Sequence, residues 1–256
     1  MLDHRLHGPA GAPVLVLSNS LGTTQELWGR QLPALAERFR VLTYDHPGHG
    51  ASPLPEEPCT VEALARSLAE LLDDIGVEHV SLCGVSLGGM VGMALALQEP
   101  SRVERLVLAC TSAHLGPSEA WQERASVVRT GGVETIADTV VGRWFTTELA
   151  REQPETVARF RAMIAATPPE GYARCCEAVA AWDAQGRISA IVAPVLILAG
   201  GEDRSAPVEH AELLASRIPG SRLIVLEHAA HLANVERPES FTKAMLEHLG
   251  QEVAAA

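Results

Sequence analysis

One serine in this chain stands in a context that could make it a nucleophile. Ser86 is the centre of the sequence Gly-Val-Ser-Leu-Gly at residues 84–88, which follows the apolar run Val80–Cys83 and opens a second run, Met90–Leu97. A Gly-x-Ser-x-Gly sequence between a strand and a helix predicts a very tight turn with the serine at positive φ and only small residues on either side. The turn would hold the hydroxyl beside a helix N-terminus, which favours developing negative charge.

A serine nucleophile needs a histidine as general base and a carboxylate that orients the histidine. Asp203 follows the apolar run Val195–Ala199 and is the expected carboxylate; its neighbour Glu202 is the alternative, which we expect to face solvent. His231 follows the last apolar run and is the expected base, with His228 as the alternative. The chain order serine, acid, histidine is that of α/β-hydrolases.

Acyl transfer also requires two N–H donors for the oxyanion that forms during attack. One is expected from Leu87, the residue after the nucleophile. The other is expected from the loop Asn19–Gly22, which follows an early strand, with the backbone N–H of Leu21 as the donor.

Apolar, β-rich segments that alternate with helical patterns must position these residues. Strands are expected at Val14–Ser18, Arg40–Tyr44, Val80–Cys83, Leu106–Ala109, Val195–Ala199 and Leu223–Leu226. Helices are expected at Val61–Ile75, Leu87–Leu97, Val208–Arg217 and Pro238–Leu249. Strands that are apolar throughout predict an α/β fold with a mostly parallel central sheet and helices on both faces. A first edge strand is expected to be missing or very short.

Residues 116–187 interrupt this alternation. They contain no convincing β run, several helical patterns, three of the four tryptophans and the adjacent pair Cys175 and Cys176. We therefore expect an inserted helical cap at 116–187, over an α/β core formed by 1–115 and 188–256. The cysteine pair is expected to be buried structure, because no basic partner is evident beside it.

Composition narrows the range of partners. The chain has 256 residues, 47% of them hydrophobic, and a net charge of −12, which argues against nucleic acid and anionic membranes as partners. No apolar run is long enough to span a bilayer and no secretory signal is evident, so a cytoplasmic protein is expected. The five cysteines are odd in number and lack metal-ligand spacing, which favours reduced thiols. No spacing in the chain indicates a metal or an organic cofactor, so neither is expected. The oligomeric state is left open.

Six segments, in order along nearly the whole chain, match those of one enzyme family. They are Leu17–Thr23 with Trp28 downstream, Tyr44–Ser52, Cys83–Met90, Gly142–Thr146, Gly171–Cys176 and His231–Pro238. On these segments the chain resembles the 3-oxoadipate enol-lactonases of the α/β-hydrolase superfamily. The Asn-Ser-Leu-Gly, Arg-Trp-Phe-Thr and Tyr-x-x-Cys-Cys sequences carry the resemblance to this family in particular.

The resemblance implies hydrolysis of a small enol-lactone that bears an acetate side chain, within the β-ketoadipate pathway of aromatic breakdown. Ser86 would form an acyl-enzyme and His231 would act as base in both steps. The spare carboxylate of this anionic lactone needs a cation, for which Arg143 is the candidate, with Trp144 as an apolar wall. An arginine and a tryptophan in a cap can equally be structural.

Other functions remain open. Other small-ester or lactone hydrolases, cofactor-free haloperoxidase-like enzymes and carbon–carbon bond hydrolases would use the same three residues. A non-catalytic ligand receptor built on the same fold is a further alternative, against which the complete set of serine, histidine and aspartate argues.

Overall fold

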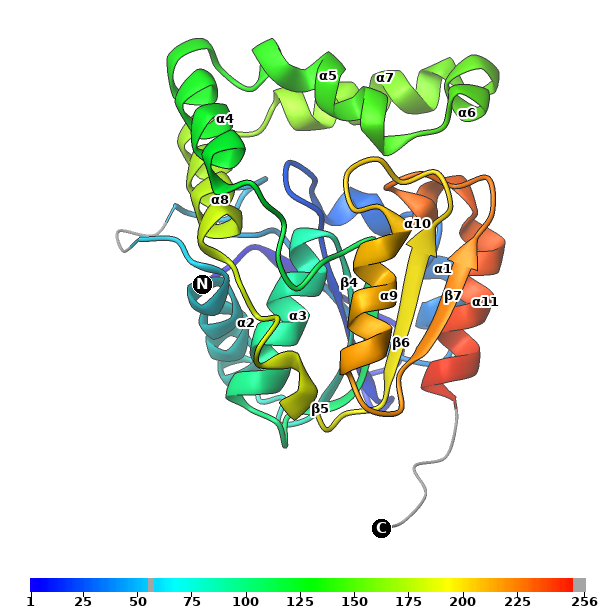
Figure 1. The fold of residues 1–256 in the computed structure, drawn as a ribbon. Helices are drawn as coiled ribbons and strands as arrows, with labels where there is room; N and C mark the ends of the chain where they lie inside the picture. Colours follow the sequence, from blue (N-terminus) through cyan, green and yellow to red (C-terminus); the bar gives the residue numbers. More distant parts are fainter. Residues whose placement is uncertain (55–57, 251–256) are drawn as a thin grey trace.

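A mostly parallel sheet forms the centre of the molecule (Figure 1). The computed structural model describes residues 1–54 and 58–250. Within these residues the sheet has seven strands in the order β1-β3-β2-β4-β5-β6-β7. The strands are β1 (His4–His7), β2 (Val14–Ser18), β3 (Arg40–Tyr44), β4 (Val80–Val85), β5 (Val103–Ala109), β6 (Val195–Gly200) and β7 (Arg222–Leu226).

All six predicted strands are present, and the predicted mostly parallel sheet is confirmed. The strand β4, which carries Ser86 at its end, is buried along its whole length because β2 and β5 flank it and helices cover both its faces. The first edge strand is present but only four residues long, and it pairs antiparallel with β3. Its residues are half-buried or exposed, so the sequence has no apolar run that would predict this strand.

Helices cover both faces of the sheet (Figure 1). On one face α2 (Val61–Asp74) packs against α3 (Leu87–Gln98), and α9 (Val208–Arg217) follows β6. On the other, α1 (Leu32–Ala36) packs against α11 (Pro238–Leu249). The short elements η1 (Gln25–Trp28), η2 (Ile188–Ala190) and α10 (Ala233–Glu236) complete this part. The four predicted helices are confirmed, α9 and α11 with the predicted bounds.

Five further helices lie as a layer across the ends of the strands (Figure 1). They are α4 (Ser118–Gly131), α5 (Glu134–Trp144), α6 (Thr147–Glu152), α7 (Pro154–Ala165) and α8 (Pro169–Ala181), and are called the cap below. No helix in the part of the chain that the structure describes is both long and apolar enough to cross a membrane.

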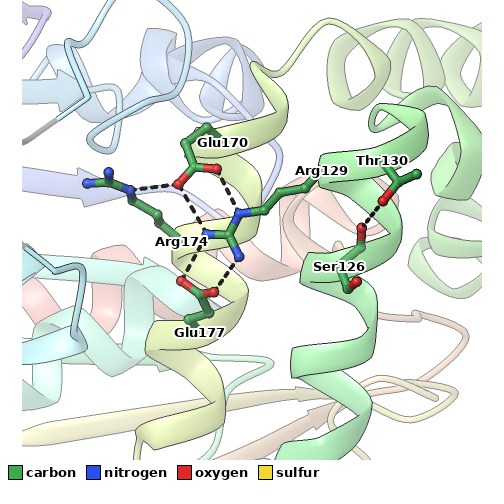
Figure 2. Close-up of polar contacts among 6 residues, drawn as sticks. All are labelled: Ser126, Arg129, Thr130, Glu170, Arg174 and Glu177. Carbon is green, nitrogen blue, oxygen red and sulfur yellow. Dashed lines mark hydrogen bonds and ion pairs between the residues drawn. The ribbon is translucent and has the colours of Figure 1, made fainter.

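An ion-pair network on the outside of the cap joins α4 to α8. Figure 2 shows the Arg129 guanidinium between Glu170 and Glu177, with N–O distances of 2.7 and 2.5 Å. Glu170 also accepts from Arg174 at 2.9 Å. The groups are substantially exposed, so each pair contributes at most about 1 kcal/mol to stability. The network therefore links the two helices but adds little to the stability of the fold.

The cysteines are all free thiols, and Cys175 and Cys176 are buried as expected. Burial raises the pKa of the Cys176 thiol to about 12, and it also raises the pKa values of Cys83 and Cys110. These three thiols therefore stay protonated at neutral pH.

Candidate active site

Ser86 lies on the turn between β4 and α3 with φ 57° and ψ −116°, so the predicted positive φ is confirmed. A Cβ on Gly84 would lie 2.1 Å from the Gly88 carbonyl oxygen, and a Cβ on Gly88 would lie 2.1 Å from the Ser18 carbonyl oxygen. The turn therefore requires glycine at both positions. The Ser86 N–H donates to Ala109 O at 2.9 Å, which helps to hold this strained conformation in place.

Asp203 and His231 are brought together by the loops that follow β6 and β7. The His231 Nδ1 lies 2.8 Å from Asp203 Oδ2, and both side chains are almost completely buried. The second oxygen, Oδ1, accepts the N–H groups of Ser205 at 2.7 Å and Ala206 at 2.9 Å, which fixes the carboxylate plane. Because the carboxylate accepts from Nδ1–H, the His231 Nε2 is left as the basic nitrogen.

Glu202 and His228, the alternative carboxylate and histidine, lie at the surface and away from this pair. The side chains of Glu202 and His228 are 55% and 71% exposed and face each other at 3.8 Å on the surface. The predicted exposure of Glu202 is thereby confirmed. Ser86 and His231, in contrast, line the same cavity of about 340 Å³ under the cap.

The oxyanion donors are expected where two free N–H groups meet this cavity. Leu21 lines it, and Leu87 is the first residue of α3, directly after Ser86. Within the described residues, neither the Leu21 N–H nor the Leu87 N–H donates to a protein acceptor. The neighbouring N–H groups of Gly22 and Thr23 are both used, for His49 Nε2 and Ser20 O. This pattern leaves the two expected donors available to a ligand.

The predicted cap residues also line the cavity. Trp144 is buried and packs edge-on against Phe160, with ring centroids 6.4 Å apart. Arg143 is exposed, in the last turn of α5. Trp28, which belongs to the first of the resembling segments, lies in the core, where its Nε1–H donates to Asn19 Oδ1 at 2.9 Å.

Further residues that line the cavity were not predicted from the sequence. Arg124 on α4 stacks over the ring of Trp121 at 4.4 Å, and Tyr172 lines the same cavity. Arg204 and His210 line the same cavity from the loop after β6 and from α9. Trp121 and Arg124 are three residues apart on one helix, a spacing that could have indicated a shared face. Among the described residues, no carboxylate pairs with Arg124, Arg143 or Arg204 within 4.0 Å.

Within residues 1–54 and 58–250, no cluster of three or more His, Cys, Asp or Glu side chains could hold a metal ion.

Comparison with known proteins agrees with this geometry. The α/β hydrolase fold family matches residues 13–238. The 3-oxoadipate enol-lactonase 2 of Acinetobacter baylyi is 38% identical, over 95% of this chain and 91% of its own. The putative carbamate hydrolase RutD of Stutzerimonas stutzeri is 32% identical over 100% of both chains. The crystal structure of the enol-lactonase from Burkholderia xenovorans LB400 has a TM-score of 0.95 at 39% identity and covers 98% of this chain and 96% of its own.

The chain belongs to the α/β-hydrolase family. Within this family it is a carboxylic-ester hydrolase, and it is similar along almost its whole length to 3-oxoadipate enol-lactonases.

Proposed function

We propose that this enzyme hydrolyses 3-oxoadipate enol-lactone to 3-oxoadipate with Ser86, His231 and Asp203 as its catalytic triad. One observation carries the proposal: a serine on a strained turn and a histidine oriented by a buried aspartate open onto the same cavity. The similarity to two enol-lactonases over more than nine-tenths of the chain supports the substrate.

The geometry supports the following reaction. Ser86 Oγ attacks the lactone carbonyl carbon while His231 Nε2 takes the hydroxyl proton, and Asp203 stabilises the imidazolium. The N–H groups of Leu21 and Leu87 hold the resulting oxyanion. The bond from the acyl carbon to the ring oxygen then breaks. The expelled enolate takes the proton from the His231 imidazolium and becomes a ketone, which leaves His231 neutral. Water attacks the acyl-enzyme with His231 as base again, which releases 3-oxoadipate and restores the Ser86 hydroxyl.

The substrate carboxylate requires a cation, and two cap arginines are candidates. Arg143 is the residue expected from the sequence. Arg124 is the second, because it lines the cavity and stacks on Trp121, which restrains its guanidinium. A bidentate guanidinium suits a carboxylate, and a pocket of positive groups is needed in a protein with a net charge of −12. This activity would place the enzyme in the β-ketoadipate pathway.

A second candidate function is hydrolysis of a carbamate. The full-length similarity to a putative carbamate hydrolase favours it. The same triad would attack the carbamate carbonyl, with an amine or ammonia as the leaving group in place of the enolate.

The test is ultraviolet-monitored hydrolysis of 3-oxoadipate enol-lactone by the purified enzyme and by the variant Ser86→Ala. We expect rapid loss of the lactone, reduced about 10,000-fold or more in the variant because the nucleophile is gone. Hydrolysis of p-nitrophenyl acetate through Ser86 without turnover of the lactone would reject the substrate and leave the triad standing. Undiminished lactone turnover by Ser86→Ala would reject the triad.

A further inference from the structure

A second turn lies beneath the loop that carries Leu21. This turn, residues 45–50 with the sequence Asp-His-Pro-Gly-His-Gly, follows β3 directly. Its two histidine rings are completely buried. His46 Nε2 lies 2.9 Å from Asn19 O, and His49 Nε2 accepts the Gly22 N–H at 3.1 Å. The two rings therefore contact the first and last residues of the loop 19–22.

The hydrogen bond from Gly22 determines the state of the His49 ring. A backbone N–H can only donate, so His49 Nε2 must be unprotonated and the ring neutral. The proton is then on Nδ1, which lies 3.3 Å from Pro47 O and can donate to it. Burial lowers the pKa of His49 to about 4, which is consistent with a neutral ring at the pH where esterases are assayed.

Further contacts hold both ends of the loop 19–22. The Asn19 side chain donates to Tyr44 O at 2.6 Å and accepts from Trp28 at 2.9 Å. Gly22 has φ +76°, and a Cβ there would lie 2.8 Å from Ile164 and 2.9 Å from Tyr172 of the cap. Gly22 is thus held between the His49 ring and the cap, and the unused Leu21 N–H is adjacent to it.

We propose that His49 is a positioning residue, which through its hydrogen bond with Gly22 aims the Leu21 N–H at the oxyanion. The proposal rests on the role given above to Leu21. Asn19 fixes the start of the loop through its own side chain, whereas Gly22 has no side chain and depends on an external acceptor. If the loop could rotate at Gly22, the Leu21 N–H would no longer be aligned with the oxyanion. This change would weaken stabilisation of the transition state more than it would weaken binding of the substrate.

The test compares His49→Met with His49→Gln. Glutamine can place Oε1 near the position of Nε2 and accept the Gly22 N–H, whereas methionine has similar bulk without a comparable acceptor. We expect kcat to fall about 10- to 100-fold in His49→Met, because loss of an aligned oxyanion donor costs up to about 1,000-fold. KM should change little, and His49→Gln should recover most of the lost kcat.

Both the enol-lactone and p-nitrophenyl acetate should be used as substrates. Any ester that reacts through Ser86 forms an oxyanion, so the effect must appear with either one. If the enol-lactone is not the substrate, the aryl ester still measures the effect of His49. Hydrolysis of the aryl ester by Ser86→Ala tests the triad separately.

A transition-state analogue distinguishes positioning from general packing. A small alkylboronic acid that adds to Ser86 places a tetrahedral oxygen at the oxyanion position, and its affinity should weaken in His49→Met in parallel with kcat. Inhibition by the ground-state product carboxylate should stay unchanged. Wild-type kcat in His49→Met would overturn the inference, as would equal losses in His49→Met and His49→Gln. If His49→Met does not fold, His49→Asn, whose shorter side chain does not reach the Nε2 position, replaces it with the same expected outcomes.

Discussion

The cavity differs in charge from the molecule that encloses it. Arg124, Arg143 and Arg204 line it without carboxylate partners among the described residues, in a chain with a net charge of −12. Guanidinium groups left unpaired at a cavity are suited to an anionic ligand. Of the three, Arg124 is the most constrained, because it is half-buried and stacked on Trp121.

Removing either cap guanidinium should therefore affect anionic substrates selectively. We expect Arg124→Gln to raise KM for the enol-lactone about 10- to 100-fold, equivalent to one charge-assisted hydrogen-bond pair, and Arg143→Gln to raise it less because the side chain is exposed. The KM for neutral p-nitrophenyl acetate should not change. Arg129→Gln is a matched control, since Arg129 lies on the same helix as Arg124 but is paired outside the cavity (Figure 2). Equal effects on both substrates would instead indicate a structural role.

The choice of carboxylate and histidine can be checked by paired variants. Asp203→Asn should lower kcat about 1,000- to 10,000-fold, because an amide favours the wrong tautomer of His231. Glu202→Gln and His228→Gln should leave kcat within about twofold, as expected for exposed groups outside the cavity. Steady-state kinetics with either ester decides the matter, and a large loss in Glu202→Gln would contradict the assignment.

Among the elements, α10 connects the cap to the loop that carries His231. Its last residue, Glu236, is buried and accepts the Thr146 N–H at 3.0 Å on one oxygen and the Ala230 N–H at 2.8 Å on the other. The Thr146 hydroxyl also donates to it. One carboxylate thus links the end of α5, with Trp144, to the residue before His231.

Replacing this carboxylate by an amide should cost stability. Glu236→Gln turns an NH₂ group toward one of the two backbone N–H donors, so at least one charge-assisted bond is lost at about 1.5–3 kcal/mol. The midpoint of urea unfolding should fall accordingly. Glu239→Gln, an exposed position in the first turn of α11, is the control and should change stability by no more than about 0.5 kcal/mol. Equal midpoints for Glu236→Gln and the wild type would show that the link contributes nothing.

For the whole molecule, buried histidines connect stability to pH. Burial lowers the pKa of His46 to about 3, and of His49 and His248 to about 4. In the unfolded chain each would titrate near 6.5, so the unfolded state binds more protons between pH 6.5 and about 4. The free energy of unfolding therefore falls as the pH falls through this window. Asp45, whose pKa burial raises above 3.8, acts in the opposite direction at pH values above about 3.8.

Removing one of these histidines should flatten the pH dependence. Each contributes a slope of up to about 1.4 kcal/mol per pH unit, so His49→Gln should reduce the slope between pH 6 and 5 by about that amount. Urea unfolding at a series of pH values measures it. The exposed His79, replaced by glutamine, is the control and should leave the slope unchanged. A slope in His49→Gln equal to that of the wild type would mean that His49 is already protonated in the native state or remains neutral in both states.

Features that depend on neighbours along the chain can be predicted from local patterns of residues. The apolar runs predict six strands and four helices because burial on both faces of a sheet, or on one face of a helix, requires a local pattern. The turn at Ser86 follows in part from local sterics, since Gly84 faces Gly88 within the turn. Gly88 faces Ser18 at the end of β2, a contact that exists only in the folded chain. The edge strand β1 left no such signal because it pairs on one side only and stays largely exposed.

The sequence favours Asp203 over Glu202 and His231 over His228 by position along the chain. The tertiary structure adds that Asp203 and His231 are buried against each other, whereas Glu202 and His228 are exposed. It also placed Arg124 at the cavity, through the packing of α4 on α8. The roles inferred for His49 and Glu236 depend on hydrogen bonds between residues 27 and 90 positions apart. Such contacts exist only once the chain has folded, since no local periodicity or propensity specifies which distant donor a buried acceptor will meet.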